Sequence, residues 1–203
     1  MPETIPDDMI PRSGDALLVV DMQNDFMPGG ALGVTDGDQI VPEVNRLIEL
    51  FSDRGLPVVL SRDWHPPDHC SFKEQGGVWP VHCVQDTSGA AFTPDLKMPS
   101  DPRLISKATR VDHEAYSAFD GTGLNDILTR LHVTRVFIVG LATDYCVVET
   151  VKDARRAGFE VVVPENGVRA VNVHPEDGPR ALEEMIKLGA AVVSATARQG
   201  AGA

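Results

Sequence analysis

Short apolar runs alternate with amphipathic segments along the chain. Six runs rich in Val, Ile and Leu lie at residues 16–20, 57–60, 103–106, 135–140, 160–163 and 190–194. Continuous apolar runs of this length are typical of strands that are buried on both faces, as in a parallel sheet. The pattern therefore predicts a mainly parallel sheet of six strands.

Helical periodicity fills much of the space between these runs. The segment 41–54 spaces four apolar residues at i, i+3, i+4 and i+7, and Gly55 follows it as a stop signal (Val44, Leu47, Ile48 and Phe51). Further helices are predicted at 124–131, 145–157 and 179–188. Strands that alternate with helices in this way predict a three-layer α/β/α domain with right-handed crossovers.

The chain has 203 residues, a length typical of one domain. We expect a single domain over residues 15–196, with flexible segments at 1–14 and 197–203. The first residues lack the basic and apolar regions of a signal peptide, and no run reaches the ~18 apolar residues of a membrane helix. The connection 62–102 fits no regular element, and connections that long are usually functional or disordered.

Acidic residues outnumber basic ones, 30 to 18, and the net charge is −12. Nucleic acids and anionic membranes bind basic surfaces, so neither is expected as a partner. The three cysteines do not imply a disulfide framework. A reducing, cytoplasmic setting is the simpler expectation.

Reactive side chains follow several predicted strands directly. Asp21, Asp63 and Lys107 come after the first three runs, and the segment 143–146 comes after the fourth. In open α/β sheets, ligands bind outside the carboxyl ends of the strands. We therefore expect these side chains to lie together at one edge of the sheet.

The second of these strand ends has the ligand types of a metal site. Asp63 and His65 are two residues apart, so in an extended chain both point to the same side. His82 could complete a three-ligand site, and His69 is a possible fourth ligand. Such a set with open positions is typical of a catalytic ion, and Zn²⁺, Fe²⁺ and Mn²⁺ all tolerate it. The alternative is that these polar residues only hydrogen-bond one another.

The fourth strand end offers a nucleophile. Cys146 falls in the first turn of the predicted helix, where unpaired N–H groups stabilise a thiolate or an oxyanion. Asp21 could accept the thiol proton, and Lys107 could stabilise the developing charge. The alternative is that Cys146 is a small buried apolar residue. Cys70 and Cys83, in the long connection, have no assigned role.

Several distinctive segments occur in order along the chain. They are Val20-Asp-Met-Gln-Asn-Asp-Phe-Met-Pro-Gly-Gly30, Ser61-Arg-Asp-Trp-His-Pro66, Asp68-His-Cys-Ser-Phe72, Trp79-Pro-Val-His-Cys-Val84, Lys107, Tyr116-Ser-Ala-Phe119 and Gly140-Leu-Ala-Thr-Asp-Tyr-Cys-Val147. Together these segments closely resemble the nicotinamidase (pyrazinamidase) branch of the isochorismatase-like, or cysteine hydrolase, superfamily. The resemblance spans roughly residues 15–194.

The resemblance implies a role for each matching residue. It implies a catalytic triad of Asp21, Lys107 and Cys146. It also implies a cis peptide bond before Ala142, with an oxyanion hole made by the N–H groups of Ala142 and Cys146. The implied metal ligands are Asp63, His65 and His82, with His69 used only in some members. The implied substrate contacts are Phe26 and Trp79, which sandwich the ring, and Tyr116, which lines the pocket.

The implied reaction is hydrolysis of nicotinamide to nicotinate and ammonia through a cysteine thioester, a step of NAD salvage. The resemblance also implies activity on pyrazinamide, one divalent metal ion and a homo-oligomer. A related cysteine amidohydrolase acting on N-carbamoyl or ureido groups is the first alternative, but it need not carry the two metal motifs. Isochorismatase itself does not need the cysteine. A non-catalytic module that binds a pyridine ligand is the alternative from another class.

One segment departs from the resemblance. The spacer between Lys107 and Tyr116, Ala-Thr-Arg-Val-Asp-His-Glu-Ala, is charged. We therefore expect the rim of the pocket to differ here from other members of the family.

Overall fold

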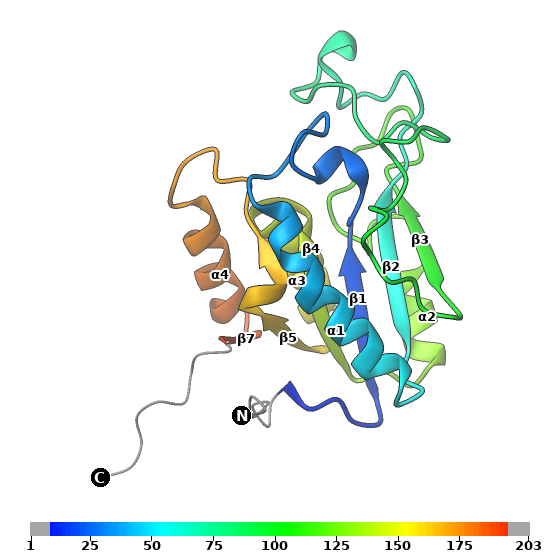
Figure 1. Ribbon diagram of the computed structural model, residues 1–203, viewed down its shortest axis with the longest axis vertical. Coiled ribbons are helices and arrows are strands. Elements are labelled where there is room, and N and C mark those ends of the chain that lie inside the picture. The colour runs from blue at the N-terminus through cyan, green and yellow to red at the C-terminus, as the bar shows by residue number, and fades with distance from the viewer. Residues whose placement is uncertain (1–8, 195–203) are drawn as a thin grey trace.

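A computed structural model describes residues 9–194 (Figure 1). Its centre is a parallel sheet in the order β3-β2-β1-β4-β5-β7, with β6 paired to the end of β4. The strands are β1 (Asp15–Val20), β2 (Val58–Asp63), β3 (Arg103–Lys107), β4 (Arg135–Leu141), β5 (Glu160–Pro164), β6 (Val168–Arg169) and β7 (Ala191–Val193). The six predicted strands and the parallel α/β class are confirmed. The seventh strand, β6, has two residues and is too short to give a pattern.

Four α-helices accompany the sheet: α1 (Val41–Ser52), α2 (Leu124–Arg130), α3 (Val148–Arg156) and α4 (Asp177–Lys187). They match the predicted helices, with one difference of kind. The helix predicted at 145–157 is divided, because residues Thr143–Val147 form a π-helical turn, η5, before α3 begins. Val147 N–H bonds to the carbonyl of Ala142, five residues back, so this turn is wider than an α-helical one.

The helices cover both faces of the sheet, and alternate residues of β1 show how. Leu17 and Val19 pack in one apolar core with α1, whereas Leu18 and Val20 pack in a second core with α2, α3 and α4. The ribbon shows α1 crossing one face of the sheet while α3 lies behind it (Figure 1). This confirms the three layers predicted from the alternation of strands and helices.

Much of the long connection after β2 lies beyond the carboxyl ends of the strands, and its last part returns to the start of β3 (Figure 1). Isolated bridges tie it together, His65 to Val84 and Phe72 to Trp79. The Phe72 side chain is fully buried, which anchors the connection by apolar packing. Three histidines and both tryptophans are therefore held above the sheet edge.

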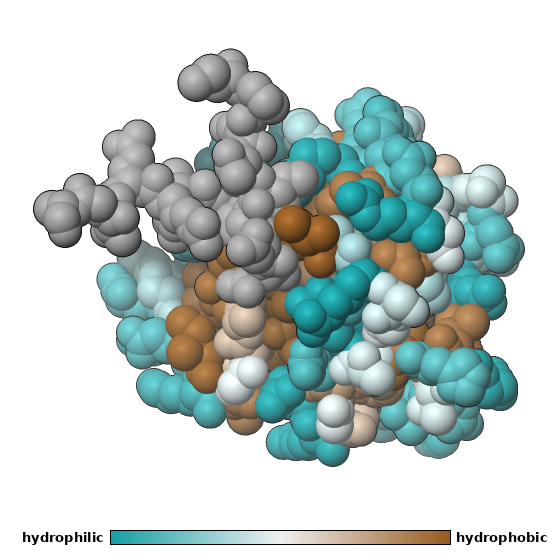
Figure 2. All heavy atoms as spheres, turned by 90° about the horizontal axis from the view of Figure 1, so that it is seen from below, coloured by the Kyte–Doolittle hydropathy of each residue, from teal (hydrophilic) through white to brown (hydrophobic). Residues whose placement is uncertain are grey.

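The described part of the amino-terminal segment, residues 9–14, packs against the domain. Met9 is buried in the α1-side core, and the Arg135 guanidinium donates to the Ile10 carbonyl. Residues 1–8 and the segment 197–203 lie outside the described residues. At the end of the molecule that holds the amino ends of the strands, apolar side chains show between polar ones (Figure 2). Within residues 9–194, no helix is long and apolar enough to cross a membrane.

Candidate active site

The strand register brings the charged residues together. Asp63 ends β2 and is the pairing partner of Lys107, which ends β3. Asp21 follows β1, and its N–H donates to the carbonyl of Ser61 in β2. Cys146 follows β4, the strand on the other side of β1. From β1 the chain adds strands first on one side, β2 and β3, and then on the other side, β4 and β5. The boundary between β1 and β4 is therefore a topological switch point, which is where open α/β sheets bind ligands.

The Lys107 ammonium is the centre of this cluster and is completely buried. Its Nζ lies 3.0 Å from Asp21 Oδ2, donates to Asp63 Oδ1 and lies 3.4 Å from Cys146 Sγ. It also donates to the Ala115 carbonyl at 3.1 Å. The single cation is thus shared between two carboxylates and the thiol, which fixes all three around it.

Burial and the shared charges set the pKa values of the cluster between them. Burial raises the pKa of the Asp21 carboxyl above its ordinary value, although the Lys107 ammonium opposes the shift. It also raises the pKa of the Cys146 thiol well above its ordinary value, again against Lys107. Burial alone would lower the pKa of Lys107, but Asp21 and Asp63 outweigh it and hold that pKa well above the ordinary value. The resting cysteine is therefore a thiol that needs a base.

The Asp21 carboxylate is held in one orientation beside the cysteine. The Ser61 hydroxyl donates to Asp21 Oδ1 at 2.7 Å. The other oxygen, Oδ2, is buried and accepts no hydrogen bond of normal geometry, although the Lys107 ammonium lies beside it. Oxygens of Asp21 and Asp63 and the Cys146 sulfur all lie within 4.8 Å of one another. One carboxylate oxygen is therefore fixed and the other is available for the thiol proton.

A second cluster adjoins the first and suits a divalent cation. Asp63, His65 and His82 each present a ligand atom, and the three atoms lie within 4.8 Å of one another. Both ring nitrogens of His65 are buried and lack a hydrogen-bond partner, which is costly unless a ligand occupies them. His82 Nδ1 bonds to the Pro80 carbonyl at 2.8 Å, which leaves Nε2 for the metal. The residues present therefore fit a three-ligand metal site.

His69 lies beside this cluster, its ring centroid 4.2 Å from that of His65. Both of its nitrogens are engaged, Nδ1 with the Ser71 hydroxyl at 2.8 Å and Nε2 with the His113 carbonyl at 3.0 Å. The carbonyl can only accept, so Nε2 carries the proton. In this arrangement both His69 nitrogens are engaged, although one of them lies within 4.8 Å of a His65 nitrogen and a Glu114 oxygen.

Buried polar contacts hold the metal cluster in place. Gln23 is fully buried, and its amide bonds to the main chain of Asp63 on both sides, at 2.7 Å and 2.8 Å. Asp25 Oδ2 accepts the N–H of Cys83 at 2.7 Å, next to His82. These two side chains come from the turn after β1, so one turn positions ligands from two distant segments.

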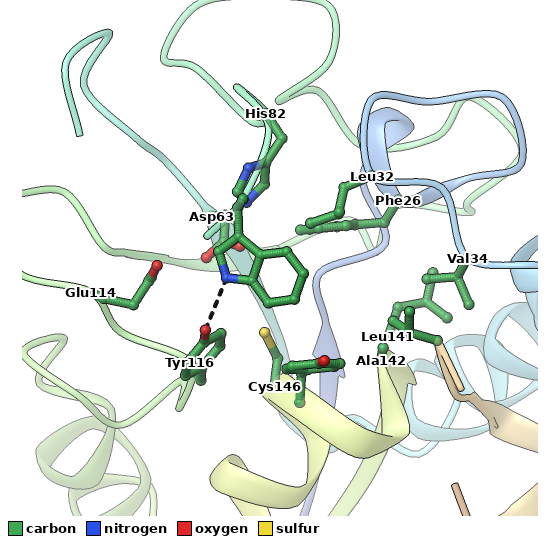
Figure 3. Close-up of a pocket in the computed structure, with 13 residues that line it drawn as sticks. Phe26, Leu32, Val34, Asp63, His82, Glu114, Tyr116, Leu141, Ala142 and Cys146 are labelled. Carbon is green, nitrogen blue, oxygen red and sulfur yellow. Dashed lines mark hydrogen bonds between the residues drawn. The ribbon is translucent and has the colours of Figure 1, made fainter. Parts of the chain in front are cut away.

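A pocket of about 460 Å³, including space open to solvent, lies over both clusters (Figure 3). Its lining is mostly apolar and aromatic with a few polar groups, as is usual for sites that bind small molecules. One wall is apolar, and the opposite wall carries polar groups, with the Cys146 sulfur directed into the cavity (Figure 3). The apolar wall is formed by Phe26, Leu32, Val34, Leu141 and Ala142, and the polar wall by Asp63, His82, Glu114 and Tyr116.

Aromatic contacts fix the ring of Trp79 in the pocket. Its indole N–H donates to the Tyr116 hydroxyl at 2.9 Å (Figure 3). Tyr145 meets the indole edge-on, with ring centroids 5.2 Å apart. The peptide bond between Leu141 and Ala142 is cis. Ala142 and Cys146 both line the pocket, at the start and within the π-helical turn.

The family model of the isochorismatase domain matches residues 15–197 of the chain. The chain belongs to the isochorismatase family. Within this family it falls in the nicotinamidase branch, as the resemblance predicted. It is 41% identical to the nicotinamidase of Escherichia coli (strain K12), over 86% of this chain and 92% of that protein.

Two solved structures show the same fold. The pyrazinamidase of Pyrococcus horikoshii in complex with zinc is 52% identical, with a TM-score of 0.86 over 89% of this chain and 99% of that one. The PnC1 protein from L. infantum in complex with nicotinate is 34% identical, with a TM-score of 0.83 over 91% of this chain and 94% of that one.

The structure brings the residues singled out in the sequence to a single place. Phe26, Trp79 and Tyr116 line the pocket with Asp63, His82, Ala142 and Cys146, while Asp21, His65 and Lys107 lie buried beside it. Sequence reasoning missed Gln23, Ser61, Glu114 and Tyr145. Two of them could have been found from the sequence. Tyr145 directly precedes the candidate nucleophile Cys146, and Glu114 belongs to the charged spacer before Tyr116. Gln23 and Ser61 lie in segments that carry the resemblance, but the pattern did not show their long-range contacts.

Proposed function

We propose that the chain is a metal-dependent amidohydrolase that converts nicotinamide to nicotinate and ammonia. The observation that carries this proposal is the meeting of Asp21, Lys107 and Cys146 beneath a mostly apolar pocket, beside a three-ligand cluster. The nicotinamidase branch of the family supports an amide as substrate. Pyrazinamide, with a similar ring, is a second substrate in this proposal. The product would return the pyridine ring to NAD salvage.

The aromatic wall would hold the substrate ring. Phe26 and Trp79, which both line the pocket, would sandwich it, and such stacking contributes about 0.5–1.5 kcal/mol beyond burial. Asp63, His65 and His82 would hold one divalent ion, Zn²⁺ or else Fe²⁺ or Mn²⁺, which would supply a Lewis acid that orients the ligand and polarises water. The zinc complex of the Pyrococcus horikoshii relative supports the choice of zinc.

The first half of the reaction would transfer the acyl group to Cys146. Asp21 Oδ2 takes the thiol proton, and the sulfur attacks the carboxamide carbon. The N–H groups of Ala142 and Cys146 bind the oxygen as it gains negative charge. Loss of one such donor typically slows catalysis roughly 10²–10³-fold. Asp21 then gives its proton to the leaving nitrogen, so ammonia departs and a thioester remains.

The second half would hydrolyse that thioester. Asp21, again ionised, takes a proton from a water molecule as the oxygen attacks the thioester carbon. The sulfur leaves with the proton that Asp21 returns, which restores the thiol and releases nicotinate. Lys107 keeps Asp21 oriented through both halves, and the burial that raises the pKa of this carboxyl strengthens it as a base.

Removal of the metal tests this proposal directly. We expect ammonia release from nicotinamide to be lost after dialysis against a chelator and to return on addition of Zn²⁺, Fe²⁺ or Mn²⁺. His82→Ala should lose both the activity and the rise in unfolding temperature that added metal gives the wild type. His174→Ala, at an exposed histidine, should behave as the wild type does. Full activity of the metal-free protein would contradict the proposal.

A further inference from the structure

A carboxylate at the substrate pocket forms no ion pair with a lysine or arginine, although one of its oxygens lies within 4.8 Å of ring nitrogens of His65 and His69. Glu114 lines the cavity on the polar wall (Figure 3). Within residues 9–194, none of the ion pairs that the structure forms includes it. We propose that Glu114 is a specificity-determining residue that excludes anionic pyridine carboxylates, so that the product is not retained. This inference rests on the proposed function, because it concerns the product of that reaction.

Two hydrogen bonds hold the main chain on either side of Glu114, and a third holds its side chain. The His69 ring bonds to the carbonyl of His113, and Lys107 donates to the carbonyl of Ala115. The N–H of Ala115 donates to Glu114 Oε1 at 2.9 Å. The carboxylate is therefore held at the pocket wall, beside the histidines of the metal cluster. It is preorganised in the way that selective sites require.

The fixed charges of the pocket explain why a further carboxylate is useful. Lys107 carries one positive charge, and it is matched by Asp21 and Asp63. A divalent cation at the metal cluster would leave the pocket floor with one excess positive charge. That floor would attract any anion. Glu114 is the remaining charged residue among those that line the pocket, and it cancels the excess.

Substrate and product differ in charge at one position only. Nicotinamide is neutral, whereas nicotinate has the same ring and a carboxylate. A fixed negative charge in a half-buried pocket therefore acts on the product and leaves the substrate nearly unaffected. The carboxylates of Asp63 and Asp21 are already paired with Lys107, so the charge of Glu114 decides the net charge of the pocket. Loss of its charge should favour the anion selectively.

The test compares Glu114→Gln with the wild type, both loaded with zinc to the same measured content. We expect calorimetry to show nicotinate binding about tenfold more tightly to Glu114→Gln, in keeping with the removal of one like charge. The KM for nicotinamide should change much less. Product inhibition by nicotinate should strengthen in step with binding.

Two further variants separate charge from shape. Glu114→Asp keeps the charge and should bind nicotinate as weakly as the wild type does. Glu165→Gln makes the same change in net charge at an exposed residue outside the pocket, and it should leave nicotinate binding unaltered. Equal nicotinate affinity in the wild type and Glu114→Gln would overturn the proposal. Tighter binding to Glu114→Asp would overturn it as well. Failure of the wild type to release ammonia from nicotinamide would instead count against the proposed function.

Discussion

Individual side chains at this site act through contacts that the sequence reveals unevenly. Asp21, Asp63 and Lys107 could be predicted because each directly follows an apolar run, and parallel strands end at one edge. Gln23 and Ser61 could not, because their roles come from hydrogen bonds to residues 40 positions away. The sequence also left open whether His69 is a metal ligand, since only the structure shows that both of its nitrogens form hydrogen bonds.

Tyr116 gives a prediction at the residue scale. Tyr116→Phe removes the hydroxyl that accepts the Trp79 N–H at 2.9 Å. The hydrogen bond that orients the indole, worth about 1 kcal/mol, would be lost. We therefore expect the KM for nicotinamide to rise roughly fivefold with a smaller change in kcat. Steady-state kinetics measure both constants. Tyr145→Phe is the control, because its ring contact with Trp79 does not need the hydroxyl. A KM unchanged by Tyr116→Phe would contradict this role.

Elements were more predictable than the turns between them. Each predicted strand and helix is present within a few residues, because apolar periodicity reports burial directly. The π-helical turn that holds Cys146 was not predicted, because its wider hydrogen bonding has no residue pattern of its own. The long connection was also beyond the sequence, since isolated bridges and buried aromatic rings order it in place of regular elements.

Gly140 gives a prediction at the scale of elements. It ends the pairing of β4 with β1 at a φ of +117°, and a Cβ there would lie 2.0 Å from the Val20 carbonyl oxygen. Gly140→Ala should therefore lower the free energy of unfolding by at least about 3 kcal/mol. Gly158→Ala, also at positive φ but with open space, should cost only about 1–2 kcal/mol. Urea denaturation measures both, and equal losses would contradict the steric reason.

At the scale of the whole molecule, the order of the strands creates the site. The switch between β1 and β4 places segments from four strand ends around one pocket. The net charge of −12 adds a general repulsion of anions, which salt screens beyond about 10 Å. It complements the local charge of Glu114. The expected homo-oligomer stays a prediction, and sedimentation of the full chain would measure it.

Ammonia release from nicotinamide by the zinc-loaded wild type and Cys146→Ala tests the central claim most directly. We predict turnover by the wild type, well above that with an N-carbamoyl amide. Cys146→Ala should show no ammonia release but should still bind nicotinamide, because the pocket walls are unchanged. Near-normal turnover by Cys146→Ala, or a wild type that prefers the N-carbamoyl amide, would contradict the account.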